Sequence, residues 1–280
     1  MTDDVRTDYG QLPANGGAPL GEGAAGAREG RLRQVLLGAI PFVIGLGLWE
    51  LLGRLNLESF RYVIPTPEGV ILALLADLKS GQLGAHLWIT MQEVFAGLGI
   101  AIVSAVVLGG LIGRSRLLEQ AFYPSIVFFQ ALPKVALAPL WLIAFGFGLG
   151  SKIALAAMIG FFPLLMGVIV GMGAIRREEI ELMRSLKASE WQIFTKVQVP
   201  RAFPSFFGGL EVGAVFALIG AVVGEFVGAQ GGLGYLIDFR SSRLDLPGIF
   251  SALVVLAMIG VIFDLGFRAL GRKLMHWEGE

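Results

Sequence analysis

Five ionisable side chains stand inside or beside long apolar stretches of this sequence, and they are its first candidates for chemistry. They are Glu93, Lys134, Glu211, Glu225 and Asp264. A charge at the centre of a bilayer costs ~3 kcal/mol or more unless it is paired or hydrated, so such groups face a bundle interior, a cavity or a boundary. In a membrane protein they could couple ion movement to transport or line a path for a solute.

Two of these side chains have alternative interpretations. Lys134 lies between prolines in an interrupted apolar stretch, where it either lines a translocation path or anchors a local bend. Glu225 is either a pathway residue or a structural pair near the external end of its helix, and Asp264 fits a solvated helix end. Aromatic side chains nearby either form an apolar gate or simply pack: Phe128, Phe129, Phe161 and Phe162. Our pathway candidates are Phe129, Lys134, Phe161, Phe162 and Glu225.

A polar island between two apolar stretches, residues 178–204, carries the second group of candidates. Ile180, Met183 and Leu186 recur at near-helical spacing while charged residues occupy the other faces. This pattern predicts an amphipathic surface helix that ends near Lys187 and Ala188.

A second short helix is predicted directly after the first. Ser189 and Gln192 have the spacing of a capping box, in which each side chain satisfies a backbone N–H of the other residue. We expect Pro200 to end this helix, because proline has no N–H and clashes with the preceding turn. Trp191 and Phe194 lie on its apolar stripe, which either a partner's groove or the chain's own helices should cover.

The spacing in this segment resembles the cytoplasmic signature of permease subunits of binding-protein-dependent ABC importers. That signature reads E-A-A, three residues, G, nine residues, I-x-L-P. The corresponding residues here are Glu181-Leu182-Met183, Lys187, Val197, Val199 and Pro200. Lysine replaces glycine, and a left-handed turn at that position would cost lysine ~1 kcal/mol.

Two further runs, residues 132–167 and 224–237, resemble the sulfonate, taurine and nitrate branch of these permeases. Glu93 and Glu211 stand where members of that branch commonly carry arginine. The resemblance covers the chain from about residue 32 onward.

The resemblance implies a type I ABC importer permease fold and a set of partners. These are a second permease copy in a homodimer, two cytoplasmic ATPase subunits that bind ATP and Mg²⁺, and an external substrate-binding protein. The solute would be a small anion such as an organosulfonate, taurine or nitrate, moved by alternating access. The residues expected to couple to the ATPase are Glu181, Lys187, Ala188, Ser189, Trp191, Phe194 and Pro200.

The composition excludes several other classes of protein. Of 280 residues, 55% are hydrophobic, with 22 basic and 22 acidic side chains, whereas about a quarter of a soluble domain is charged. The zero net charge argues against nucleic-acid binding. No cysteine, metal motif, phosphate-binding loop or nucleophile–base pair is present, so we expect no enzymatic activity, no metal site and no cofactor bound by this chain.

The apolar stretches predict an all-α integral membrane protein with about six spanning helices. They cover residues 34–53, 94–113, 120–151, 153–175, 203–228 and 249–266, the third being broken at its prolines. Thr66, Pro67 and Glu68 should start a short one-sided helix on the membrane surface. Residues 1–30 lack large apolar side chains and are expected to form a flexible cytoplasmic tail before a permease domain of residues 31–280.

The lysines and arginines set the expected orientation, since basic segments stay cytoplasmic. With both termini inside, cytoplasmic segments hold 15 of the 22 basic residues, external segments hold six, and Lys134 lies within the membrane. The polar segment 178–204 is then cytoplasmic, and the resemblance implies that the protein lies in a bacterial inner membrane.

Two questions remain open: what the glycine-rich face of one predicted helix packs against, and whether the protein is an importer subunit or belongs to another class. Gly209, Gly213, Gly220, Gly224 and Gly228 allow close helix approach, within this chain or across a dimer seam. The chain could also be a self-contained secondary transporter or channel using its membrane carboxylates and Lys134, although nothing in it resembles an inverted repeat. A membrane-embedded enzyme is a third, weaker alternative.

Overall fold

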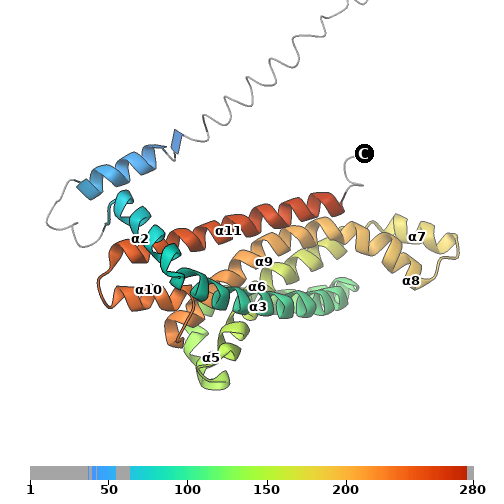
Figure 1. Ribbon diagram of the computed structural model, residues 1–280. Coiled ribbons are helices and arrows are strands. Elements are labelled where there is room, and N and C mark those ends of the chain that lie inside the picture. The colour runs from blue at the N-terminus through green and yellow to red at the C-terminus, as the bar shows by residue number, and fades with distance from the viewer. Residues whose placement is uncertain (1–36, 38–39, 42, 55–63, 276–280) are drawn as a thin grey trace, which may run out of the picture. The chain divides into compact units, whose positions relative to one another are not determined.

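The computed structural model describes residues 37, 40–41, 43–54 and 64–275, and no strand occurs among them (Figure 1). The chain divides into two compact units, Met1–Leu55 and Asn56–Glu280. In the first unit residues 37, 40–41 and 43–54 are helical, and all of them except Arg54 fall within the expected first membrane helix of residues 34–53. The rest of that helix, the expected tail of residues 1–30 and the last five residues lie outside the described part of the chain.

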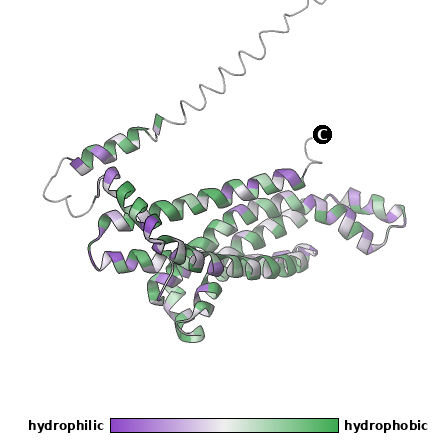
Figure 2. Cartoon of the chain, viewed as in Figure 1, coloured by the Kyte–Doolittle hydropathy of each residue, from purple (hydrophilic) through white to green (hydrophobic). Residues whose placement is uncertain are grey.

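The second unit is built on long apolar helices. Four of them are long and apolar enough to cross a membrane: α3 (Gln82–Gly113), α6 (Leu149–Gly173), the continuous helical stretch Glu190–Gly228 that ends in α9 (Val199–Gly228), and α11 (Leu246–Leu274). Figure 2 shows hydrophobic residues along these helices. The helix expected over 94–113 instead begins at Gln82. It therefore also contains His86, which is half-buried, and Glu93, which is buried.

The expected broken helix over 120–151 is confirmed as a bent pair. α4 (Arg116–Ala131) ends before Pro133, and a single 3₁₀ turn, η1 (Lys134–Leu137), leads into α5 (Ala138–Phe145). The two parts meet at 77°. If this pair counts as one span, the described residues contain five candidate spans, which correspond to five of the six expected; the sixth, residues 34–53, is described only in part.

α6 and α9 form a tightly packed antiparallel pair. A Cβ added at Gly220 would lie 2.8 Å from Ala156 Cα, and one added at Gly213 would lie 3.1 Å from Gly160 O. The other three glycines of the α9 row also abut residues of this chain, from α5, α6 or the turn between them. Their close approach is therefore packing within the chain.

α2 (Pro67–Ser80) starts as expected, with Thr66 Oγ1 accepting from Gly69 N at 3.2 Å. It packs on α11, and its Asp77 carboxylate is buried against α10 (Leu233–Ser241). Arg240 donates two hydrogen bonds to that carboxylate, at 2.9 and 2.5 Å, and Ser251 donates one at 2.8 Å. A location of α2 on the membrane surface stays a prediction.

The polar segment folds as α7 (Arg177–Ser185), α8 (Glu190–Ile193) and a π-helical turn, η2 (Phe194–Gln198), that runs into α9. The prediction that Pro200 ends the second helix is wrong. Val199 N donates to Phe194 O across the wider π turn, and the helix continues through Pro200. A π turn just before a proline makes room for the ring and removes the need for its missing N–H.

Candidate functional site

The bend between α7 and α8 is a rigid turn closed by backbone hydrogen bonds. Ala188 N donates to Met183 O at 3.0 Å, and Lys187 N donates to Arg184 O at 2.9 Å, which together form a Schellman motif. Lys187 occupies its left-handed position with φ 56°. The left-handed turn considered in the sequence analysis is therefore present, and it is made with lysine.

The start of α8 confirms the expected capping box. Ser189 N donates to Gln192 Oε1 at 2.8 Å, and Gln192 N donates to Ser189 Oγ at 3.3 Å. An ion pair of 3.2 Å between Arg184 and Glu190 crosses the same turn. The shape of the bend thus depends on its own side chains and backbone.

The outer surface of the bend is apolar and uncovered. Trp191 is 71% exposed and packs against the half-buried ring of Phe194, with 5.8 Å between ring centroids. Leu182 and Leu186 of the preceding turn are also exposed, whereas Ile193 is buried. A hollow of about 370 Å³ lies beside Trp191, lined by Arg114, Glu190 and the two aromatic rings. The chain's own described helices therefore leave Trp191 free for a partner.

The other coupling candidates lie on the same bend. Glu181 and Lys187 are exposed, and Ala188 is half-buried. Pro200 lies in the first turn of α9, where the π turn joins the bend to that long helix. The structure brings these candidates together in one segment that connects α6 to α9.

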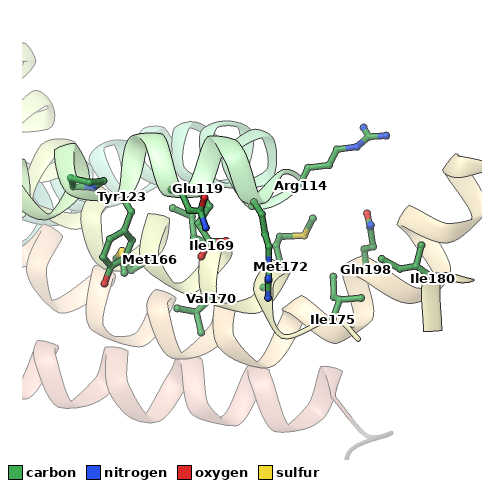
Figure 3. Close-up of a pocket in the computed structure, with 15 residues that line it drawn as sticks. Arg114, Glu119, Tyr123, Met166, Ile169, Val170, Met172, Ile175, Ile180 and Gln198 are labelled. Atoms are coloured by element: carbon green, nitrogen blue, oxygen red, sulfur yellow. The ribbon is translucent and has the colours of Figure 1, made fainter. Parts of the chain in front are cut away.

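A larger cavity of about 890 Å³ opens at the same end of the helices (Figure 3). It lies between the α3–α4 turn and the ends of α6 and α7. Its lining combines Arg114, Arg116, Glu119 and Tyr123 with apolar side chains of α6. Its size and mixed lining suit a small organic solute.

The pathway candidates do not form one group. Lys134 Nζ lies 4.6 Å from the centroid of the Phe162 ring and donates to Gln130 O at 2.9 Å. Phe161 packs edge-on against Phe162, while Phe129 is exposed on α4. Through its bond to Gln130 O, Lys134 caps the end of α4. This contact fits the interpretation of Lys134 as an anchor at a local bend.

Glu225 lies apart from these residues, in a buried polar cluster at the end of the bundle opposite the α7–α8 bend. It is 1% exposed. Thr90 Oγ1 donates to its Oε1 at 2.6 Å, and Gly234 N donates to its Oε2 at 2.5 Å. Its interpretation as a structural pair fits this geometry better than a role lining an open path.

Lys152 belongs to the same cluster. The sequence does not single it out, because it falls between the predicted spans 120–151 and 153–175 and counts among the six external basic residues. It is 1% exposed on the first turn of α6. Its ammonium group donates to the carbonyls of Phe147, Gly148 and Gly228 at 2.6, 3.1 and 2.8 Å. One signal could have identified it. Lys152 directly precedes the apolar run 153–175, and the carboxylates of Glu93 and Glu225 lie in or beside two other apolar runs that could supply its partners.

Glu93 is 1% exposed on α3, whereas the other two ionisable candidates pair with Arg268 of α11. Glu211 lies 3.4 Å from it, and Asp264 receives its hydrogen bond at 2.9 Å. Asp264 stays partly exposed, in agreement with a solvated position. The described residues hold no group of three or more potential metal-ligating side chains close enough to bind one ion.

Comparison with known proteins identifies the family. Residues 97–276 match the family described as binding-protein-dependent transport system inner membrane component. The chain belongs to this family. It is accordingly an inner-membrane protein and a transport subunit of the ABC permease type.

Curated relatives of this permease carry several different substrate names. The formylaminopyrimidine transport permease protein ThiX of Halalkalibacterium halodurans is 31% identical over 248 residues, 89% of this chain and 98% of that protein. The riboflavin transport system permease protein RibX of Chloroflexus aurantiacus is 39% identical, covering 78% and 81%. The taurine transport system permease protein TauC of Escherichia coli is 29% identical, covering 89% and 92%.

Solved structures support the same fold. The permease is similar to a chain of the inward-facing MetNI methionine ABC transporter, with a TM-score of 0.61 at 19% identity over 70% of this chain and 98% of that one. A chain from an amino acid ABC transporter gives a TM-score of 0.56 at 17% identity, over 72% and 97%. The type I importer permease fold expected from the sequence is thus matched by its structural neighbours.

Proposed function

We propose that this permease forms the translocation pathway of an ATP-driven importer and receives the work of ATP hydrolysis through the α7–α8 bend. The exposed Trp191 on a rigidly capped turn is the observation that carries this proposal. An apolar side chain of this size, left uncovered on a polar segment, fits the groove of a protein partner. The partner is a separate ATPase subunit that binds ATP and Mg²⁺.

The connections of the bend explain how a push on it would reach the pathway. It joins the end of α6 to the start of α9, and these two helices pack too closely to slide past each other. Closure of two ATPase subunits would therefore move α6 and α9 as one body. A second permease copy completes the pathway, and rigid-body rotation of the pair alternates access between the two sides.

The orientation follows from the basic side chains of the same segment. Six lysines and arginines lie between Arg176 and Arg201, which favours the cytoplasmic side. The long helices alternate in direction, so α10 and the ends of α9 and α6 near Lys152 lie on the external side. There an external substrate-binding protein would deliver the solute.

The proposed solute is a small organic anion of the organosulfonate or taurine type, or nitrate. Arg114 and Arg116 line the inner cavity and favour an anion. TauC, and SsuC of Bacillus subtilis, named as a putative aliphatic sulfonates transport permease and 29% identical, support this class. ThiX and RibX point to larger heterocyclic solutes, so binding measurements on the cognate substrate-binding protein decide between the classes.

Self-contained ion-coupled transport is less well supported by the geometry. Glu93, Glu225 and Lys152 are each 1% exposed, and Lys134 is bonded to a helix-end carbonyl. Coupling ions need an open route to such groups. Solute movement by the purified chain in vesicles without any ATPase would nevertheless overturn the importer proposal.

Co-purification of the ATPase with variants of the permease tests the docking surface. Trp191→Ala removes a large exposed anchor and should weaken the complex by about 30-fold, the effect of a hot spot of about 2 kcal/mol. Ile143→Ala is the control, because Ile143 is 82% exposed but lies on α5. Thermal unfolding of both variants should match the parent chain. Equal ATPase binding by the parent chain and Trp191→Ala would contradict the proposal.

A further inference from the structure

Two buried carboxyl groups lie at the end of the bundle opposite the α7–α8 bend. Glu93 on α3 and Glu225 on α9 are each 1% exposed, and Glu93 lies on the same face of α3 as Thr90, three residues before it, whose Oγ1 donates to Glu225 Oε1 at 2.6 Å. A hydrogen bond between two carboxyl groups requires a proton on one of them. Glu93 Oε2 is buried and has no hydrogen-bond partner among the described residues.

The charges around this pair do not neutralise both carboxylates. Lys152 of α6 reaches the same end of α9, but an ammonium group has three donors, and those of Lys152 reach the carbonyls of Phe147, Gly148 and Gly228. Lys152 therefore contributes one positive charge and no direct hydrogen bond to either acid.

The other titratable groups near the pair are engaged elsewhere. His86 of α3 accepts a hydrogen bond from Gly232 N on its Nδ1 and packs on Tyr235 of α10. Arg240 of α10 is bonded to the buried carboxylate of Asp77. One net positive charge beside two carboxyl groups suits one ionised and one neutral acid.

The distribution of donors decides which acid is ionised. Glu225 accepts hydrogen bonds from Thr90 Oγ1 and Gly234 N, and such donors favour the ionised form. Glu93 receives no comparable donor among the described residues. We propose that Glu93 is a protonated carboxylic acid that donates a hydrogen bond to the Glu225 carboxylate, and that this proton-sharing pair positions the start of α10.

The contacts of α10 show what the pair positions. Its first N–H groups are satisfied by side chains of other helices: Gly232 N by His86, Leu233 N by Thr90, and Gly234 N by Glu225. Gly232 has φ 108°, and a Cβ there would collide with the Glu225 carboxylate. Ionisation of both acids would set two carboxylates against each other and displace Glu225 from Thr90 and Gly234 N, so the shared proton keeps α10 docked.

Infrared spectroscopy of the full chain in lipid vesicles tests the protonation state directly. The parent chain should show the C=O stretching band of a protonated carboxylic acid at neutral pH, shifted in D₂O. Glu93→Gln should abolish the band, while Asp264→Asn, which changes a partly exposed carboxylate paired with Arg268, should leave it unchanged. Absence of the band in the parent chain, or its persistence in Glu93→Gln, would overturn the proposal.

The pH dependence of unfolding gives a second readout. The folded chain holds a proton that an exposed glutamate has released at neutral pH, so stability should fall as the pH rises above neutrality, with a slope of one proton. Glu93→Gln supplies a neutral donor without a titrating proton and should lose that slope. Identical slopes for the two chains would also overturn the proposal. If the variant does not fold, the infrared spectrum of the parent chain still decides.

Discussion

Arg201 Nη2 lies 2.6 Å from Glu179 Oε1, so the first turn of α9 is tied directly to α7 across the bend. The pair is partly open to solvent, at 62% exposure for the arginine and 26% for the glutamate. A pair of this kind contributes at most about 1 kcal/mol to stability. Its larger effect is geometric, because it fixes the angle between α7 and α9 on the two sides of the bend.

Breaking this tie should therefore impair coupling more than folding. Arg201→Gln should reduce transport-coupled ATPase activity in the reconstituted importer while shifting the unfolding free energy by less than about 1 kcal/mol. The charge-swapped pair Glu179→Arg with Arg201→Glu should restore part of the activity. Arg184→Gln is the matched control, since its pair with Glu190 is exposed on both sides and stays within the turn. Equal loss in both single variants would argue against a specific role for the α7–α9 tie.

The lysine at the left-handed position gives a stability prediction. Lys187 has φ 56°, a conformation that costs a residue with a Cβ about 1 kcal/mol or more relative to glycine. Lys187→Gly should raise the unfolding free energy by about 1 kcal/mol if the α7–α8 bend unfolds with the rest of the chain. Lys187→Ala keeps the Cβ and should not show this gain. Thermal or denaturant unfolding of the three chains makes the comparison, and an equal gain in both variants would point to the loss of the lysine charge instead.

Local signals in the sequence predicted the shape of the bend. The capping box at Ser189, the end of the first helix near Lys187 and the cap at Thr66 were all predictable, because each depends on residues within one turn. The break at Pro133 was predictable for the same reason. Proline acts on the backbone of its immediate neighbours.

The parts that sequence reasoning missed depend on distant contacts. Pro200 would end an isolated helix, but the π turn of η2 carries the chain into α9, whose packing on α6 stabilises the continuous helix. Lys152 was assigned to a loop because its partners, including Gly228 O, come from the far end of another helix. The role of the bend in transport stays a prediction, which the Trp191→Ala and Arg201→Gln variants test. The role of the cavity also stays a prediction.

The buried ion pair between Arg240 and Asp77 should be essential for the end of the bundle opposite the α7–α8 bend. Asp77→Ala leaves the guanidinium buried without its carboxylate and should cost about 3–5 kcal/mol. Asp245→Asn is the control, because Asp245 lies 3.7 Å from the same arginine, is half exposed, and as asparagine can still cap α11. Its effect should stay within about 0.5 kcal/mol. Unfolding of the purified chains measures both, and similar small losses would mean that water reaches Arg240.

The close approach of α6 and α9 should tolerate no added methyl group. A Cβ at Gly220 would lie 2.8 Å from both Ala156 Cα and Leu155 O, which are backbone atoms and cannot turn aside. Gly220→Ala should therefore force the helices apart and cost about 1–3 kcal/mol. Gly208→Ala on the same helix meets nothing within 4 Å and should gain about 0.5–1 kcal/mol from the better helix former. Opposite signs in unfolding measurements would confirm that α6 and α9 interlock at Gly220, because only a close contact with the backbone of α6 separates the two substitutions in this way.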